Sequence, residues 1–308
     1  MKKIIIVSTN AIGDTYLSCS AIDNIKNQMG DVEFDLVTLS DSMCFAELMI
    51  FRNLHYVKKR TVGNLLLLRS RLIKYEYDYA FSFFPGRFNS LIMNLIKAKN
   101  KYYYKNRRKV VDWHRSKQYL FVNNKKTSCY WNSEMNFLDR INIPLENLFS
   151  IPQKVKKPKF DTLIENIKSE LKYVIINYKS RDARKTLPIY LIDELVCFIE
   201  NDLTINVKVL NFGDSLKLKS ENIYSVKEDT QFSDLLKLIL NSSLFISIDS
   251  FLIHIADAYD IKILGLFNLT FSRSVLQSNN AFSLNYDSDC KSNVNQIKFK
   301  IKELLKNE

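Results

Sequence analysis

Glycine, proline and clustered cysteine are scarce in this sequence. Only 6 glycines and 5 prolines occur among 308 residues, a bias that genome composition can produce and that indicates no function by itself. The five cysteines are scattered without a close pair, which fits neither a zinc site nor a disulfide framework, so we expect no metal site and reduced thiols. They are Cys19, Cys44, Cys129, Cys197 and Cys290.

Long apolar runs are absent as well. No uninterrupted stretch approaches the roughly 18 apolar residues that a membrane span requires. The start, Met1-Lys2-Lys3 followed by Ile4 to Val7, looks like a signal peptide, but its apolar run already ends at Ser8. We therefore interpret it as a first buried strand and expect a cytoplasmic protein, with the inner face of the cytoplasmic membrane as a candidate peripheral contact.

A net charge of +12 indicates an anionic partner, such as nucleic acid, a phosphorylated glycolipid or a membrane leaflet. Lys97–Lys109 and Lys154–Lys159 are strongly basic, and Tyr102 to Tyr104 within the first stretch could stack on bases. No helix-turn-helix, zinc or ribonucleoprotein signature accompanies them, so nucleic-acid binding is the weaker alternative. A patch facing an anionic glycan or glycolipid acceptor is preferred over it, and a merely solvated face is favoured over both.

The length favours two domains, because a single hydrophobic core seldom grows this large. Short apolar runs alternate with amphipathic segments in the first half, as in parallel α/β sheets. A charged, proline-containing segment from Ile151 to Pro158 suits a linker, after which the alternation restarts. We expect two facing Rossmann-like α/β domains, at 1–155 and 156–308, and a closing helix over 294–305.

In the first half we expect strands at 3–8, 33–38, 55–57 and 77–83, and helices at 15–29, 42–51, 64–74, 87–98 and 129–140. In the second half we expect strands at 173–177, 206–210, 244–248 and 262–267, and helices at 189–200, 232–240 and 252–259.

The first candidate site is the turn between the opening strand and helix, which contains Thr9, Asn10, Gly13 and Asp14. Ligands of open parallel sheets bind beyond the carboxyl ends of strands, where this turn lies. Gly13 would let the backbone approach a ligand, and Asp14 would project a carboxylate into the cleft. Ordinary helix capping by these residues is the alternative.

A second candidate follows the expected strand at 244–248. The helix start after Asp249 would offer backbone N–H groups to an anion, with the Ser250 hydroxyl as a further donor. His254 would lie on the same helical face as Ser250. A diphosphate suits this site, although Asp249 would repel it unless that carboxylate orients a neighbouring donor. Capping by Asp249 and Ser250 beside a partly buried histidine is the alternative.

The third candidate is the loop from Ser180 to Pro188, which follows the first strand of the second half. Its arginines, Lys185 and hydroxyls suit phosphate binding, and Lys185 would neutralise a leaving diphosphate. A solvated loop of a basic protein is the alternative.

Taken in order, these stretches resemble the inverting glycosyltransferases of family 9, which include the lipopolysaccharide heptosyltransferases. The similarity covers nearly the whole chain. It includes Gly13-Asp14 and the loop from Arg184 to Pro188, and it is most specific from Ser247 to His254. It implies a GT-B fold whose C-terminal domain holds a nucleotide-sugar donor, ADP-heptose in that family, and whose N-terminal domain holds a lipopolysaccharide or other surface-glycan acceptor.

By that resemblance Asp14 is the general base, and Ser180, Lys185, Asp249, Ser250 and His254 form the donor site. No metal is needed if Lys185 and helix amides carry the charge of the leaving group. Phe251 stands where the family has glycine, and Asn268-Leu269-Thr270 replaces Gly-Pro-Thr. Because of these departures, a non-catalytic nucleotide- or glycan-binding protein on the same fold is an alternative.

Overall fold

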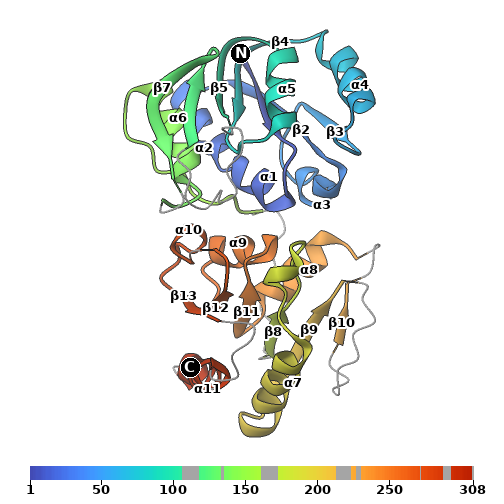
Figure 1. Cartoon of the computed structure of the whole chain (residues 1–308), viewed down its shortest axis with the longest axis vertical. Helices are drawn as coiled ribbons and strands as arrows, with labels where there is room; N and C mark the ends of the chain where they lie inside the picture. The colour runs from blue at the N-terminus through green and yellow to red at the C-terminus, as the bar shows by residue number, and fades with distance from the viewer. Residues whose placement is uncertain are drawn as a thin grey trace. The chain divides into compact units, whose positions relative to one another are not determined.

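The structure is a computed structural model. It describes residues 1–105, 118–132, 135–160, 173–212, 223–226, 230–270, 272–286 and 293–306. The chain divides into two compact units, Met1–Pro158 and Lys159–Glu308, each built around one β-sheet (Figure 1).

The first unit contains a seven-stranded sheet in the order β3-β2-β1-β4-β5-β6-β7. Neighbouring strands from β3 to β5 are parallel, whereas β6 and β7 continue the sheet antiparallel. The strands are β1 (Lys2–Ser8), β2 (Val32–Leu39), β3 (Asn53–Val57), β4 (Glu76–Ser82), β5 (Lys97–Tyr104), β6 (Gln118–Val122) and β7 (Lys125–Trp131).

Helices connect these strands and cover the sheet. They are α1 (Ile12–Ser18), α2 (Ala21–Met29), α3 (Met43–Ala46), α4 (Val62–Leu72), α5 (Arg87–Leu95) and α6 (Asp139–Phe149). Alternate residues of a strand face opposite sides, and α4 and α5 pack on the side of Ile5 and Val7. Gly30 ends α2 with φ 74°, a conformation that favours glycine.

Four expected helices of this unit differ from the structure. The helix expected at 15–29 is two helices, α1 and α2, and the helix expected at 42–51 is α-helical only in α3. The helix expected at 129–140 is a strand up to Trp131 and becomes helical only at Asp139. Exposure alternates through β7, with Trp131 fully buried, which is the period of a strand. The helix expected at 87–98 ends at Leu95, and its last residues open β5, where Lys97 pairs with Glu76.

The second unit contains a six-stranded, fully parallel sheet in the order β10-β9-β8-β11-β12-β13. Its strands are β8 (Tyr173–Asn177), β9 (Asn206–Asn211), β10 (Ile223–Ser225), β11 (Leu244–Ile248), β12 (Ile263–Phe267) and β13 (Ala281–Asn285). Its helices are α7 (Ile189–Cys197), α8 (Phe232–Leu240), α9 (Phe251–Ala258), α10 (Ser272–Val275) and α11 (Asn293–Lys306). A π-helix, Phe198–Asp202, extends α7, and the buried faces of α7 and α11 pack on one side of the sheet.

Strand order reverses at the same place in both units. In each sheet the first strand, β1 or β8, pairs with the second strand on one side and with a later strand, β4 or β11, on the other. Ligands of such sheets bind beyond the carboxyl ends of the strands that flank this switch point. Within the described ranges, no helix is long and apolar enough to cross a membrane.

A buried ion pair stabilises the first sheet away from the carboxyl ends of its strands. The Asp35 carboxylate is fully buried and accepts two hydrogen bonds from Arg52, at 2.9 and 2.7 Å, and one from the Tyr77 hydroxyl at 2.6 Å. Burial alone would raise the pKa of Asp35, but these hydrogen bonds and His55, 3.9 Å away, outweigh burial and lower it far below its usual value.

Because the pKa of Asp35 is lowered in the folded state, its stabilising contribution is complete above the unfolded value near 4 and is lost as the pH falls below it. We expect Asp35→Asn to lower the free energy of unfolding by about 3 kcal/mol at neutral pH. The same variant should lose less stability than the wild type between neutral and acidic pH. Urea unfolding at both pH values measures this, with Asp23→Asn, which removes an exposed carboxylate, as the control. Equal acid sensitivity of Asp35→Asn and the wild type would disprove the assignment.

Candidate functional site

In the first unit, the turn after β1 is fixed by the first turn of α5, which follows β4, and by the loop after β3. The backbone N–H and the hydroxyl of Thr9 both donate to Asn89 Oδ1, at 3.0 and 2.5 Å. Arg60, from the loop after β3, donates to the carbonyl oxygens of Thr9 and Asn10, at 2.7 and 2.8 Å. Three connections at the carboxyl edge of the sheet therefore meet at this turn.

Asn10 packs against the connection between β4 and α5. Its amide donates to the Pro85 carbonyl at 3.1 Å, and a Cβ at Gly86 would lie only 2.8 Å from Asn10 Oδ1. Real Cβ atoms essentially never approach that closely, so the lack of a side chain at Gly86 permits this contact. Thr9 and Asn10 thus shape the turn, with their hydrogen bonds directed to neighbouring loops.

Asp14 lies in the first turn of α1, half-buried, next to Gly13. The capping alternative is wrong for this residue, because the N-cap is Ala11 and no side chain caps the helix. A carboxylate at this position is stabilised in its ionised form by the helix dipole. The neighbouring Thr15 is buried and faces the sheet, where its hydroxyl bonds to the Ser8 carbonyl at 3.1 Å.

A buried arginine lies near Asp14. Arg140, on α6, is only 5% exposed, and its guanidinium carbon lies 3.5 Å from the centre of the Trp131 ring. Its Nε and one Nη are buried without a hydrogen-bond partner. Burial lowers the pKa of Arg140 to about 10, and the charge of Asp14 opposes that shift. Arg140 therefore adds positive potential around the Asp14 carboxylate.

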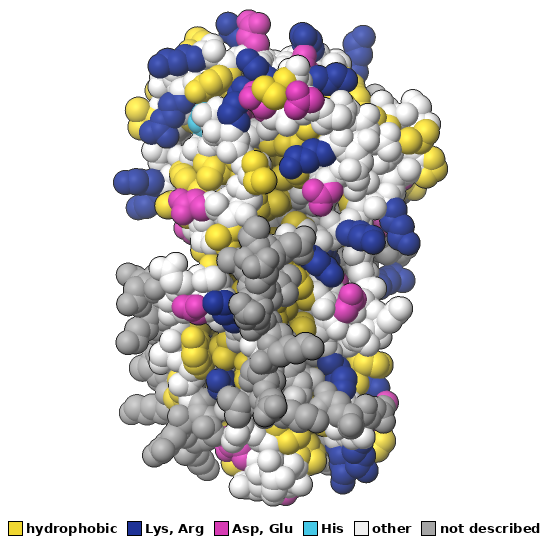
Figure 2. All heavy atoms as spheres, turned by 180° about the vertical axis from the view of Figure 1, so that it is seen from behind, with side chains coloured by type: hydrophobic (Ala, Val, Ile, Leu, Met, Phe, Trp, Pro, Cys, Tyr) yellow, Lys and Arg dark blue, Asp and Glu magenta, His cyan; other side chains and the backbone are white. Residues whose placement is uncertain are grey.

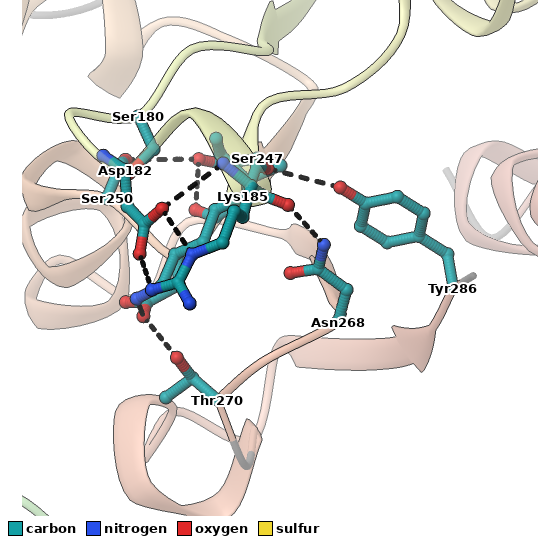
Figure 3. A network of polar contacts seen from close by, with 11 residues as sticks. Ser180, Asp182, Lys185, Ser247, Ser250, Asn268, Thr270 and Tyr286 are labelled. Atoms are coloured by element: carbon teal, nitrogen blue, oxygen red, sulfur yellow. Dashed lines mark hydrogen bonds and ion pairs between the residues drawn. The ribbon is translucent and has the colours of Figure 1, made fainter. Parts of the chain in front are cut away.

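In the second unit, Lys185 and Asp249 form a largely buried ion pair. Lys185 Nζ donates to Asp249 Oδ2, and the two side chains are only 16% and 13% exposed. Thr270 Oγ1 donates to the same carboxylate oxygen at 2.6 Å. Figure 3 shows Lys185 and Thr270 converging on this point from the loops after β8 and β12. Asp249 thus orients Lys185, for which the sequence predicts phosphate binding.

The loop that carries Lys185 is itself fixed. A short 3-10 helix, Ala183–Lys185, is capped by Asp182, and the Tyr286 hydroxyl donates to the Lys185 carbonyl at 3.1 Å. Asn268 donates to the Arg184 carbonyl at 2.6 Å (Figure 3). The Lys185 side chain is therefore held in place from both the backbone and the ammonium end.

Asp249 is ionised in this environment. Burial alone would raise its pKa, but the charges of Lys185 and His254 and the hydrogen bonds from Lys185 and Thr270 outweigh burial and lower it. His254 is buried on α9, one turn after Ser250. Among the residues with described positions, no group of three His, Cys, Asp or Glu side chains could hold a metal ion.

Ser250 is the N-cap residue of α9, but its side chain makes no capping hydrogen bond. Instead its hydroxyl accepts a hydrogen bond of 2.7 Å from Asn177, the last residue of β8, which also donates to Ser247 at 3.0 Å. The other amide atom of Asn177, Oδ1, is buried without a partner. Since the Ser250 side chain leaves the amides of the first turn of α9 uncapped, an anion can bind them.

Ser180 lies in the Lys185 loop and supports its shape. Its backbone N–H donates to the Thr186 hydroxyl at 3.3 Å, and its own hydroxyl accepts from the Asp182 N–H at 3.4 Å. Phe251, where the resembling family has glycine, stacks on Phe232 of α8 with ring centres 6.0 Å apart. Phe232 packs in turn edge-on against Phe160, so the Phe251 ring is part of an aromatic cluster.

The structure therefore brings the predicted residues together in two groups. Lys185, Asp249, Ser250 and His254 form one group, with Ser180 in the same loop as Lys185. Thr9, Asn10, Gly13 and Asp14 form the other. Sequence reasoning missed the side chains that fix these groups: Arg60, Asn89, Arg140, Asn177, Thr270 and Tyr286. Asn177 carried a signal, because it ends an apolar strand. Asn89 and Arg140 carried none, because the site residues that they fix or face, Thr9 and Asp14, are more than 70 residues away in the sequence.

The proposed stacking surface is wrong. Tyr102, Tyr103 and Tyr104 belong to β5 and are at most 7% exposed, so they cannot stack on bases. Residues 106–109 of that basic stretch lie outside the described residues.

No protein-family model matches the sequence, and no curated protein matches it either. Solved structures do match over the whole chain. E. coli heptosyltransferase WaaC with ADP has a TM-score of 0.73 at 15% identity and covers 98% of this chain and 99% of its own. ADP-heptose lipopolysaccharide heptosyltransferase II of E. coli has a TM-score of 0.71 at 13% identity, over 100% and 99%.

A family 9 glycosyl transferase from Veillonella parvula has a TM-score of 0.67 at 13% identity, over 99% of this chain and 89% of its own. At such low identity the likeness is one of fold. The expected GT-B fold, with two Rossmann-like α/β units, is thereby confirmed.

Proposed function

We propose that this chain is a metal-independent, inverting glycosyltransferase that transfers heptose from ADP-heptose to a lipopolysaccharide or related surface-glycan acceptor in the cytoplasm. The observation that carries the proposal is the group of Lys185, Asp249, Thr270 and Ser250 at the switch point of the second sheet. Heptosyltransferases with ADP and with an ADP-heptose analogue share this fold over almost the full chain, which supports the choice of donor.

The second unit has the chemistry that a diphosphate needs. Lys185 supplies a positive charge, Ser250 a hydroxyl, and the first turn of α9 supplies backbone donors with the positive end of a helix dipole. Asp249 does not contact the phosphate in this proposal; it holds the ammonium group of Lys185 ready. As the bond to the leaving diphosphate breaks, these groups stabilise the charge that develops on it, without recourse to a metal ion.

The first unit supplies the general base. The hydroxyl of a glycan bound at the Thr9 to Asp14 turn attacks the anomeric carbon of the donor from the face opposite the diphosphate, which inverts the configuration. Asp14 then accepts the proton of that hydroxyl. Its ionised state makes it a weak base, but the attacking oxygen becomes acidic as it acquires positive charge. Ser180 and His254 complete the donor site in this proposal, by shaping the Lys185 loop and by flanking Asp249.

A panel of nucleoside diphosphates and their sugars tests the proposal. We expect ADP and ADP-heptose to raise the melting temperature most, because ligands that bind the native state stabilise it. Release of ADP should then require an acceptor, and NMR of the product should show inverted anomeric configuration. Nucleotide binding without turnover for any donor would favour the non-catalytic alternative. Salt-sensitive binding to oligonucleotides without a response to any nucleotide would instead refute the proposal.

A further inference from the structure

The segment from Lys58 to Lys74, which we call the α4 surface, combines exposed apolar side chains with a single sign of charge. It comprises the loop after β3, the helix α4 and the two residues that follow it. Six basic residues are exposed there, and the sequence has no acidic residue between Lys58 and Tyr75. The basic residues are Lys58, Lys59, Arg60, Arg69, Arg71 and Lys74.

Apolar side chains occupy both faces of α4. Leu68 and Leu72 are buried in the core of the first unit, which is the ordinary role of an apolar helix face. Four further apolar residues face solvent: Val62, Leu66, Leu67 and Ile73 are 74%, 57%, 59% and 50% exposed. Core packing therefore does not explain them, and their helical spacing intermixes them with the arginines.

The intermixing of basic and apolar groups selects the partner. We propose that the α4 surface docks the protein onto an anionic lipid bilayer, with the apolar side chains inserted among the acyl chains and the basic groups at the headgroups. Exposed apolar side chains that insert at the boundary of headgroups and acyl chains, together with Lys and Arg near anionic headgroups, bind proteins to membranes in that manner. Figure 2 is turned by 180° about the vertical axis from Figure 1. Along the edge of the first unit that carries α4, it shows Lys and Arg side chains close to hydrophobic ones.

Two other partners fit less well. A symmetric dimer through this surface would place six positive charges of one copy against the same six of the other, because both copies use the same patch. Nucleic acid would satisfy the charges but would leave the four apolar side chains without apolar contacts. An anionic bilayer satisfies both kinds of group.

The position of the surface also suits the proposed function, on which this one point depends. Arg60 belongs to the α4 surface and binds the carbonyls of Thr9 and Asn10 in the candidate acceptor turn. A bilayer on the α4 surface would thus lie near the turn at which a lipid-linked glycan has to present its hydroxyl.

Co-sedimentation with vesicles tests the proposal without donor, acceptor or turnover. We expect binding to vesicles that contain about one third phosphatidylglycerol at about 0.1 M salt, and little binding to pure phosphatidylcholine. Leu66→Ser with Leu67→Ser should lower the partition coefficient by about tenfold or more, because two exposed apolar anchors are lost. Replacing Lys58, Lys59, Arg69 and Arg71 by glutamine should lower it by roughly fivefold per charge and weaken its salt dependence.

Phe299→Ser is the matched control, since it removes a large apolar side chain that is 71% exposed on α11 and should leave vesicle binding unchanged. All variants should keep the melting temperature and the nucleotide response of the wild type. Vesicle binding that is absent, indifferent to anionic lipid or unaffected by the leucine variants would overturn the proposal. So would a stable dimer in gel filtration that the leucine variants dissociate. Nucleotide binding is measured separately, so failure here leaves the proposed function untouched.

Discussion

Replacing Asp14 by asparagine is expected to lower turnover by about 10²- to 10⁴-fold, the range that general base catalysis contributes. Asparagine has nearly the same shape, so the turn around Thr9 and Asn10 should persist. Asp14 belongs to the first unit and Lys185 to the second, so the variant should bind nucleotide as the wild type does. Initial rates of ADP release, together with thermal shifts by ADP, separate these two effects.

Asp23→Asn is the control, because Asp23 also lies in the first turn of a helix in the same unit but is exposed. It should retain wild-type rates. Full turnover in Asp14→Asn would show that another group, or water, takes the proton. Equal losses of turnover in Asp14→Asn and Asp23→Asn would show that the net charge of the first unit matters, and not a general base at Asp14.

The Lys185 variant should have two separable effects. Lys185→Met leaves the Asp249 carboxylate buried with its main countercharge removed, and breaking such a pair costs about 3 kcal/mol of unfolding free energy. It also removes the positive charge that we assign to the diphosphate. We therefore expect both a lower urea midpoint and a large loss of nucleotide affinity.

The double variant Lys185→Met with Asp249→Asn separates stability from binding. Neutralising the carboxylate removes the uncompensated charge, so most of the lost stability should return. Nucleotide affinity should stay low, since no cation is restored. If affinity returned together with stability, Lys185 would be a structural residue and the donor site would lie elsewhere.

The sequence predicted the central strands of both sheets because they are apolar runs of ordinary length. β8 and β11, for instance, have the bounds that their hydrophobic patterns indicate. The hairpin of β6 and β7 could not be predicted in the same way. Its strand β7 exposes lysines and a tyrosine and is defined by pairing with β6, which no local pattern reveals. The edge strands β10 and β13 are half-exposed and were missed for the same reason.

The candidate site divides along similar lines. Lys185 and Asp249 stand at strand ends and could be found by position, but their pairing joins residues 64 positions apart and emerges only from the order of the strands. That pairing also gives the carboxylate a role beside the proposed phosphate site, because Asp249 orients the lysine. Phe251 departs from the glycine of the resembling family, and its ring belongs to an aromatic cluster with Phe232.

Titration of ADP into the wild-type protein and into the double variant by calorimetry tests the central claim, that the lysine loop and the start of α9 cradle a diphosphate. One ADP should bind per wild-type chain, more weakly at high salt, and binding to the folded double variant should fall at least about tenfold. Equal affinity for both proteins, or no heat with any nucleoside diphosphate, would contradict the account.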